Sequence, residues 1–284
     1  MKEVVITADS TCDLPKYLIE KYDIRIIPLS ILLGENSYLD GIEIFPEDVY
    51  SYVDKTGNLP KTSAVTPAMY SDVFGEITSE GKAVVHIGLS SAISSSYQNA
   101  CLSASEYSDV YCVDSKSLCT GMGLLVLKAC DFREKGFDAK KIANRVNSLV
   151  PKVCTTFVLD NLEYLHKGGR CSGVARIGAN VLGIRPSIAV DSKTGKLDVA
   201  KKYRGKIDMV YKQYINDCLK DTKKIDTSRI VIANSGNVPP EILSFAKGVI
   251  EGTENFDEII TAKAGCTISS HCCPKTLAVF YIKK

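Results

Sequence analysis

The segment from Ala83 to Ala100 constrains the fold most, because an apolar run there is followed by a serine-rich turn. Residues Ala83–Ile87 form a short apolar run of the kind found in strands buried within parallel sheets. Residues Ser96–Ala104 then favour a helix, and Gly88 with five serines separates the two elements. The segment therefore predicts one strand–turn–helix unit of an α/β fold.

The serines of this turn have two possible roles. The first turn of a helix exposes free backbone N–H groups, and the helix dipole favours negative charge there, so the turn could bind an anion. Alternatively, the hydroxyls could simply cap the helix and satisfy the turn. The sequence leaves both roles open for the five residues Ser90, Ser91, Ser94, Ser95 and Ser96.

Two further apolar runs end in similar polar clusters. The strand predicted at Val4–Asp9 continues into Ser10, Thr11 and Asp13, and the strand that begins at Val110 continues into Asp114 and two serines. Because open α/β sheets bind ligands at the carboxyl ends of their strands, we expect these groups to converge at one edge of a sheet.

The loop Leu59–Pro67 carries three more hydroxyl groups. Thr66 precedes Pro67, a pairing that predicts a helix N-cap followed by proline at the first helical position. Thr62 and Ser63 lie upstream of this cap and have no local structural role, so they are free to contact a ligand.

The pattern changes after residue 150, which suggests two α/β domains with mainly parallel sheets, residues 1–150 and residues 151–284. A short helix is expected at Asn161–His166, ended by the glycines that follow it. Further strands, or strand–helix junctions, are expected at Cys154–Leu159, Val181–Val190, Leu197–Lys202, Arg229–Asn234, Ile259–Ala262 and Thr276–Ile282.

Composition excludes several classes of protein. With 45% hydrophobic and 24% charged residues and a net charge of +2, the chain resembles an ordinary globular protein without a nucleic-acid-binding surface. Its apolar runs are shorter than the roughly 20 residues of a membrane helix, so no stable membrane insertion is expected. The first residues lack the layout of a signal peptide, which favours a cytoplasmic location.

The 11 cysteines include no C-x-x-C pair, and several lie in apolar segments, which predicts buried thiols in a reducing compartment. The neighbours Cys272 and Cys273 have no histidine or cysteine at zinc-binding spacing, so no metal site is expected. There is no nucleophile elbow, phosphate-binding loop or dinucleotide motif; Gly121 and Gly123 lack the third glycine. This inventory favours a binding protein without a cofactor over an enzyme.

Several motifs, spread in order over most of the chain, resemble those of the DegV family of fatty-acid-binding proteins. They are Asp9-Ser-Thr-Cys-Asp-Leu14, Lys61-Thr-Ser63, Gly88-Leu-Ser-Ser-Ala-Ile-Ser-Ser-Ser-Tyr97, Val113-Asp-Ser-Lys-Ser117, Leu162-Glu-Tyr-Leu-His-Lys-Gly-Gly-Arg170, Gly183-Ile-Arg-Pro186 and His271.

The resemblance implies two α/β domains with one long-chain fatty acid in a tunnel between and beneath them. It also implies a partner, a cytoplasmic fatty acid kinase that phosphorylates the bound carboxylate with ATP in support of phospholipid synthesis. The matching positions make Thr62 and Ser94 the residues that hold the carboxylate. They place five others near the head group or at the rim facing the kinase: Ser10, Ser63, Ser95, Arg170 and His271.

The chain departs from the family pattern in two places. Ser94-Ser-Ser96 stands where the family usually has Ser-Gly-Thr, and His271-Cys-Cys-Pro-Lys275 stands where it has His-Thr-Gly-Pro-Gly. We expect His271 to lie in a loop at a sheet edge. Beside a carboxylate, its pKa should be raised, because the anion favours the protonated imidazole.

Two other functions compete with lipid binding. A serine hydrolase or acyltransferase would use Ser94 as the nucleophile and His271 as the base, and would need both within hydrogen-bonding distance and a third group orienting the imidazole. A sugar or ketone kinase-like protein is a further alternative, although the chain lacks a nucleotide-binding loop.

Overall fold

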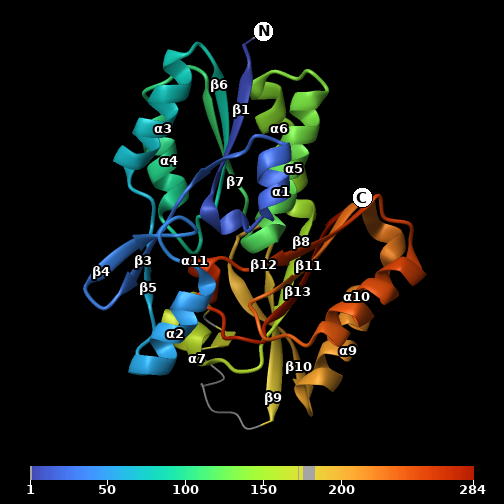
Figure 1. The fold of residues 1–284 in the computed structure, drawn as a ribbon. Helices are drawn as coiled ribbons and strands as arrows, with labels where there is room; N and C mark the ends of the chain where they lie inside the picture. Colours follow the sequence, from blue (N-terminus) through green and yellow to red (C-terminus); the bar gives the residue numbers. More distant parts are fainter. Residues whose placement is uncertain (1, 172, 175–182) are drawn as a thin grey trace.

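The computed structural model describes residues 2–171, 173–174 and 183–284, which form two α/β lobes around a shared hydrophobic core (Figure 1). The α/β class is therefore confirmed. The first sheet uses strands that precede residue 115, and the largest sheet uses strands that follow residue 152. The division of the chain into domains at residue 150 stays a prediction.

The sheet of the first lobe is fully parallel, in the strand order β2-β1-β6-β7. Helices α3 and α4 cover one side of this sheet, and α1, α5 and α6 lie on the other (Figure 1). The bounds are β1 Val4–Asp9, β2 Arg25–Ile27, β6 Ala83–Gly88, β7 Val110–Asp114, α1 Lys16–Lys21, α3 Pro67–Ser79, α4 Ser96–Ala104, α5 Cys119–Glu134 and α6 Ala139–Leu149.

A small antiparallel sheet, in the order β4-β3-β5, corrects two sequence predictions. The apolar sequence at 24–33 predicts a single strand, but the segment is divided between two sheets, because Pro28 has no N–H group to continue the ladder. The segment expected to be a loop at 61–63 is a strand, in which Thr62 pairs with Ile31. The bounds are β3 Ser30–Leu33, β4 Asn36–Leu39, β5 Lys61–Ser63 and α2 Pro46–Thr56.

The second lobe contains a six-stranded sheet in the order β10-β9-β8-β13-β11-β12. Here the expectation of a mainly parallel sheet is wrong: among the described strands of this sheet only β11 and β12 pair in parallel, since β13 inserts antiparallel between β8 and β11 and β9 pairs antiparallel with both β8 and β10. The bounds are β8 Val153–Val158, β9 Ile184–Val190, β10 Leu197–Arg204, β11 Ile225–Asn234, β12 Glu258–Lys263 and β13 Leu277–Lys283.

Helices α9 (Ile207–Cys218) and α10 (Pro240–Thr253) pack on this sheet through a separate apolar cluster. Two short helices, α7 (Glu163–Gly168) and α11 (Cys266–Ser269), lie near the junction of the lobes (Figure 1). Residues 181–182 of the strand predicted at 181–190 lie outside the described residues. The described residues also contain three 3-10 turns, at Ser10–Cys12, Val150–Lys152 and Thr222–Lys224.

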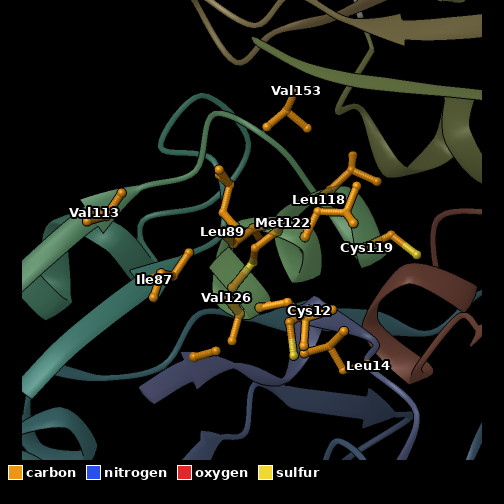
Figure 2. Close-up of a cluster of buried hydrophobic side chains, with 14 of the residues drawn as sticks. Cys12, Leu14, Ile87, Leu89, Val113, Leu118, Cys119, Met122, Val126 and Val153 are labelled. Atoms are coloured by element: carbon orange, nitrogen blue, oxygen red, sulfur yellow. The ribbon is translucent and has the colours of Figure 1, made fainter. Parts of the chain in front are cut away.

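Helix α5 connects the two lobes. Its residues from Cys119 to Leu127 are all buried, as expected for a helix that is surrounded by protein on every side. The helix contacts β1 and β6 of the first sheet and β8, β11 and β13 of the second. Figure 2 shows Leu118, Met122 and Val126 beside Leu89 and Leu14, within the apolar cluster that both lobes share.

Seven of the 11 cysteines are buried, so the expectation that most of them are buried is confirmed. His86 is fully buried in β6, with Nδ1 3.0 Å from the Thr7 hydroxyl, as expected for a core histidine. No helix in the described part of the chain is both long and apolar enough to cross a bilayer.

Candidate functional site

A cavity of about 140 Å³ lies between the two lobes and has one polar and one apolar part. The polar lining consists of Thr62, Ser63, Ser94, Ser95, Arg170, Thr267 and His271. The apolar lining consists of Leu29, Ala64, Leu89, Ile93, Leu118, Phe157, Leu165, Leu197, Ile268 and Cys272. The cavity therefore suits a ligand with a polar head and an apolar body.

A narrower apolar space of about 20 Å³ continues from this cavity. Four side chains, Leu118, Phe157, Ile268 and Cys272, line both spaces. Beyond these four, the lining of the narrow space includes Ala233 and Asn234 of β11 and Ala278 and Phe280 of β13. Together the two spaces mark a path from the polar groups toward the interior of the second lobe.

Thr62 and His271 meet in the polar part of the cavity. The Thr62 hydroxyl, at the centre of β5, lies 2.9 Å from His271 Nε2, in the turn that follows α11. His271 Nδ1 is buried and has no hydrogen-bond partner among the described residues. Gly168 makes room for the ring, since a Cβ atom there would overlap Nδ1.

The electrostatics of His271 are set by its surroundings in the protein. Burial, supported by the nearby positive charge of Arg170, lowers the pKa of His271 to about 4. The imidazole is therefore neutral at pH 7 in this structure, and the raised pKa expected beside a bound carboxylate stays a prediction. Its position in a turn agrees with the expectation, although the residue is half-buried because Gly168 and Thr62 pack against it.

The serines of this turn differ in their surroundings: some line the cavity, and others support the local structure. Ser94 and Ser95 line the cavity, whereas the Ser96 hydroxyl is buried and accepts a bond from Val65 N. The Ser94 hydroxyl lies 2.9 Å from that of Ser96 and also accepts from its backbone N–H. Ser90 is structural, because its hydroxyl donates to Gly195 O.

Ser95 occupies the N-cap position of α4 without making a side-chain cap. Its φ of −83° lies in the ordinary right-handed region, so the loss of the family's usual glycine causes no backbone strain here. Lys275 is different, because its φ of 68° lies in the left-handed region that glycine prefers. Of the two departures from the family pattern, only the second therefore strains the backbone.

The remaining predicted site residues lie in different places. Ser63 and Arg170 are exposed at the cavity lining, where Arg170 Nη1 donates to Gly168 O at 2.6 Å. Ser10 does not line this cavity: its hydroxyl donates to Asp40 and accepts from Leu29 N. The structure thus brings together six of the seven predicted residues and leaves Ser10 apart.

Sequence reasoning missed two contributors to the cavity. Thr267 lines its polar part, and its hydroxyl donates to Asp40 at 2.6 Å. Gly168 shapes the pocket that holds His271. The Gly168-Gly169 pair was visible in the sequence, but only as a helix terminator, and Thr267 carried no local signal at all.

The arrangement required by a serine hydrolase is absent from the described residues. The Ser94 hydroxyl bonds to Ser96, and His271 Nε2 bonds to Thr62 instead of Ser94. Among the residues that the structure describes, no group orients the imidazole through Nδ1. The described residues also contain no group of three or more acidic, histidine or cysteine side chains that could hold a metal ion.

The fold is similar to that of several solved structures. A DegV family protein from Thermus thermophilus, whose structure is described as showing fatty acid binding, superposes with a TM-score of 0.89 at 24% identity, over 99% of this chain and 100% of that one. A stearic-acid-binding protein from Eubacterium ventriosum superposes with a TM-score of 0.81 at 26% identity, over 100% and 99% of the two chains.

Sequence comparisons agree. A DegV domain-containing protein of Clostridium acetobutylicum is 33% identical over 286 residues, and one of Clostridium perfringens is 32% identical over the same length; each alignment covers both chains completely. The DegV family, described as a family of uncharacterised proteins, matches residues 3–284. This chain therefore belongs to the DegV family.

Proposed function

We propose that this chain binds one long-chain fatty acid and presents its carboxylate to a cytoplasmic fatty acid kinase for ATP-dependent phosphorylation. The observation that carries the proposal is the cavity between the lobes, polar at Thr62, Ser94 and His271 and apolar beyond them. Related DegV structures described as binding fatty acids, including stearic acid, support the same ligand class.

In this proposal the hydroxyls of Thr62 and Ser94 hold the carboxylate, and the neutral His271 imidazole supplies a further hydrogen bond. The tail follows the apolar path toward Ala233 and Ala278. Burying about fifteen methylene groups at roughly 0.8 kcal/mol each favours binding by on the order of 12 kcal/mol before entropic costs. The tail therefore provides affinity, while the polar groups fix the orientation.

Both apolar spaces are small, so a bound tail must separate the side chains that line them, namely Leu118, Phe157, Ile268 and Cys272. The head group lies nearer the surface, where Ser63, Ser95 and Arg170 are exposed. A kinase could reach the carboxylate from this side. Because the sequence carries no nucleotide-binding loop, ATP is assigned to the kinase.

Mass spectrometry of lipid extracted from the denatured, purified protein tests the ligand. We expect about one equivalent of a fatty acid of roughly sixteen to eighteen carbons, since an apolar path of this kind favours a filled state. If no lipid is extracted and added labelled palmitate and oleate also fail to bind, the fatty-acid proposal is wrong.

A reconstitution tests presentation to a kinase. The loaded protein, a bacterial fatty acid kinase and Mg-ATP should together give acyl phosphate, trapped with hydroxylamine, and no two of the three should suffice. Arg170→Ala should retain its lipid but transfer slowly, while Lys167→Ala, a neighbouring exposed change, should behave as wild type. Acyl phosphate formed equally well from free fatty acid would contradict the presenting role.

A further inference from the structure

A second, larger cavity of about 780 Å³ lies at the junction of the two lobes. It shares no lining residue with the 140 Å³ cavity, and shares only Asn234 of the described residues with the narrow space that continues from it. Its walls come from the turn after β1 and from the segments that follow β11 and β12, the parallel pair of the second sheet. It thus lies at the carboxyl ends of strands, where α/β sheets commonly bind ligands.

Asp13 lines this cavity and has no structural explanation. The residue is only 8% exposed, and neither carboxylate oxygen has a hydrogen-bond partner among the described residues. The polar groups that approach it are the Cys119 thiol and the Gly265 backbone N–H. A buried carboxylate without partners is costly, so its presence suggests a missing binding partner.

The other two acidic residues nearby are fully accounted for. Asp9, in the same sequence motif, accepts hydrogen bonds from the Tyr70 hydroxyl and from Leu89 N. Asp40 accepts from Cys266 N at 2.9 Å and from the Thr267 hydroxyl, among others. Both carboxylates therefore have a structural role that Asp13 lacks.

Gly265 brings Asp13 and Asp40 into the same space. A Cβ atom on Gly265 would lie 2.7 Å from Asp13 Oδ1 and 3.5 Å from Asp40 Oδ1. Burial, with a smaller contribution from the Asp40 charge, raises the pKa of Asp13 well above its usual range. The contacts with Cys119 and Gly265 act in the opposite direction and lower this pKa. A positive charge placed beside Asp13 would stabilise its ionised form.

The remaining lining determines what kind of cation fits. Nine side chains are apolar: Cys12, Leu14, Pro15, Ile19, Ile26, Ile42, Val238, Leu243 and Ala262. The basic lining residue Lys263 is exposed and lies 3.8 Å from Glu47. Apolar walls suit an alkyl group better than a hydrated metal ion, and the volume is that of an ordinary small-molecule site.

We propose that this second cavity binds a small organic cation whose ammonium or guanidinium group pairs with Asp13. The apolar walls contact the carbon chain of the ligand, and the exposed side-chain amide of Asn237 is available to its other polar atoms. This site does not rest on the fatty-acid proposal, because Asp13 lines neither the 140 Å³ cavity nor the narrow space that continues from it.

Titration of the lipid-loaded protein with butylammonium and agmatine, followed by amide NMR spectra, tests the proposal. We expect saturable shifts centred on Gly265 and Asn237, and none with butanol, which has the same alkyl chain without the charge. Asp13→Asn should weaken binding roughly ten-fold to a hundred-fold, the usual effect of losing a buried charge-assisted bond. Asp72→Asn, at an exposed position of α3, removes the same net charge and should bind as wild type.

A second variant provides a test that remains valid if Asp13→Asn fails to fold. Gly265→Ala places a methyl group against Asp13 Oδ1 and should also weaken binding, while fatty-acid content and circular dichroism stay unchanged. A short lysine peptide that binds more tightly than butylammonium would identify the cation as a side chain of a protein partner. Equal binding by wild type and Asp13→Asn, or shifts scattered away from this cavity, would overturn the proposal.

Discussion

At the scale of single residues, the site depends on a few hydroxyl groups. If Thr62 and Ser94 bond a buried carboxylate, Thr62→Val and Ser94→Ala should each weaken fatty-acid binding by about 1–3 kcal/mol. The methyl ester of the acid should bind the wild-type protein more weakly than the free acid does, and this difference in affinity should be smaller in Ser94→Ala. Isothermal titration measures both effects. An equal difference between acid and ester in the two proteins would place the head group elsewhere.

Folding should be nearly unchanged in these variants. The Ser94 hydroxyl bonds only within its own turn, and Thr62 lies on the edge strand β5 of a three-stranded sheet. Circular dichroism and thermal unfolding of the lipid-free proteins supply the control. A large loss of stability would mean that the hydroxyls support the fold more than the ligand.

Lys275 offers a residue-scale prediction about stability. Its left-handed backbone costs a side-chain-bearing residue about 1–2 kcal/mol, whereas glycine adopts it freely. Lys275→Gly should therefore stabilise the protein by up to about 1 kcal/mol. The rest of the relieved strain is offset because glycine increases the entropy of the unfolded chain. Lys275→Ala keeps the strain and should show no such gain in chemical denaturation. A loss of stability in the glycine variant would contradict this account.

At the scale of elements, close packing around α5 makes a second stability prediction. A Cβ atom on Gly123 would lie 2.7 Å from the backbone oxygen of Cys12, which cannot move without disturbing β1 and the turn after it. Gly123→Ala should therefore destabilise the fold by about 1–3 kcal/mol. Gly248→Ala, in the open face of α10, has nothing within 4 Å and should stabilise by up to about 1 kcal/mol. Urea denaturation compares the two, and similar effects would disprove the packing argument.

Most elements of the first lobe were predictable because their signals are local. An apolar run followed by a polar turn indicated β1, β6 and β7, and Thr66 caps α3 as expected, accepting from Met69 N at 3.3 Å. The division of residues 24–33 between two sheets was not predicted. The effect of Pro28 on a hydrogen-bonded ladder can be foreseen only when the neighbouring strand is known, and the sequence does not reveal that neighbour. The β5 strand escaped notice because three polar residues give no periodic signal without their partner β3.

At the scale of the whole molecule, long-range pairings determine what the sequence could not reveal. The second sheet is largely antiparallel because the last strand inserts between β8 and β11, and because β9 pairs antiparallel with both β8 and β10. Thr62 and His271 meet although 209 positions separate them. The sequence marked both residues through the family resemblance, but their contact, and the room that Gly168 provides, exist only in the folded chain.

A ligand head group between the lobes should couple binding to pH through His271. Burial and Arg170 hold the pKa of the free protein's imidazole at about 4. A bound carboxylate opposes both effects and raises this pKa, so the complex takes up a proton that the free protein does not. Affinity should therefore increase as pH falls through the bound-state pKa, by up to about ten-fold per pH unit, while the acid stays ionised.

The histidine variants separate this effect from general changes in charge. His271→Gln should flatten the pH dependence but leave binding by Thr62 and Ser94, whereas His166→Gln, at an exposed position of α7, should retain the wild-type profile. NMR titration of the His271 imidazole with and without fatty acid measures the two pKa values directly. The linkage requires the bound value to be the higher one, because only then does the complex gain a proton as pH falls; identical values would remove His271 from contact with the carboxylate.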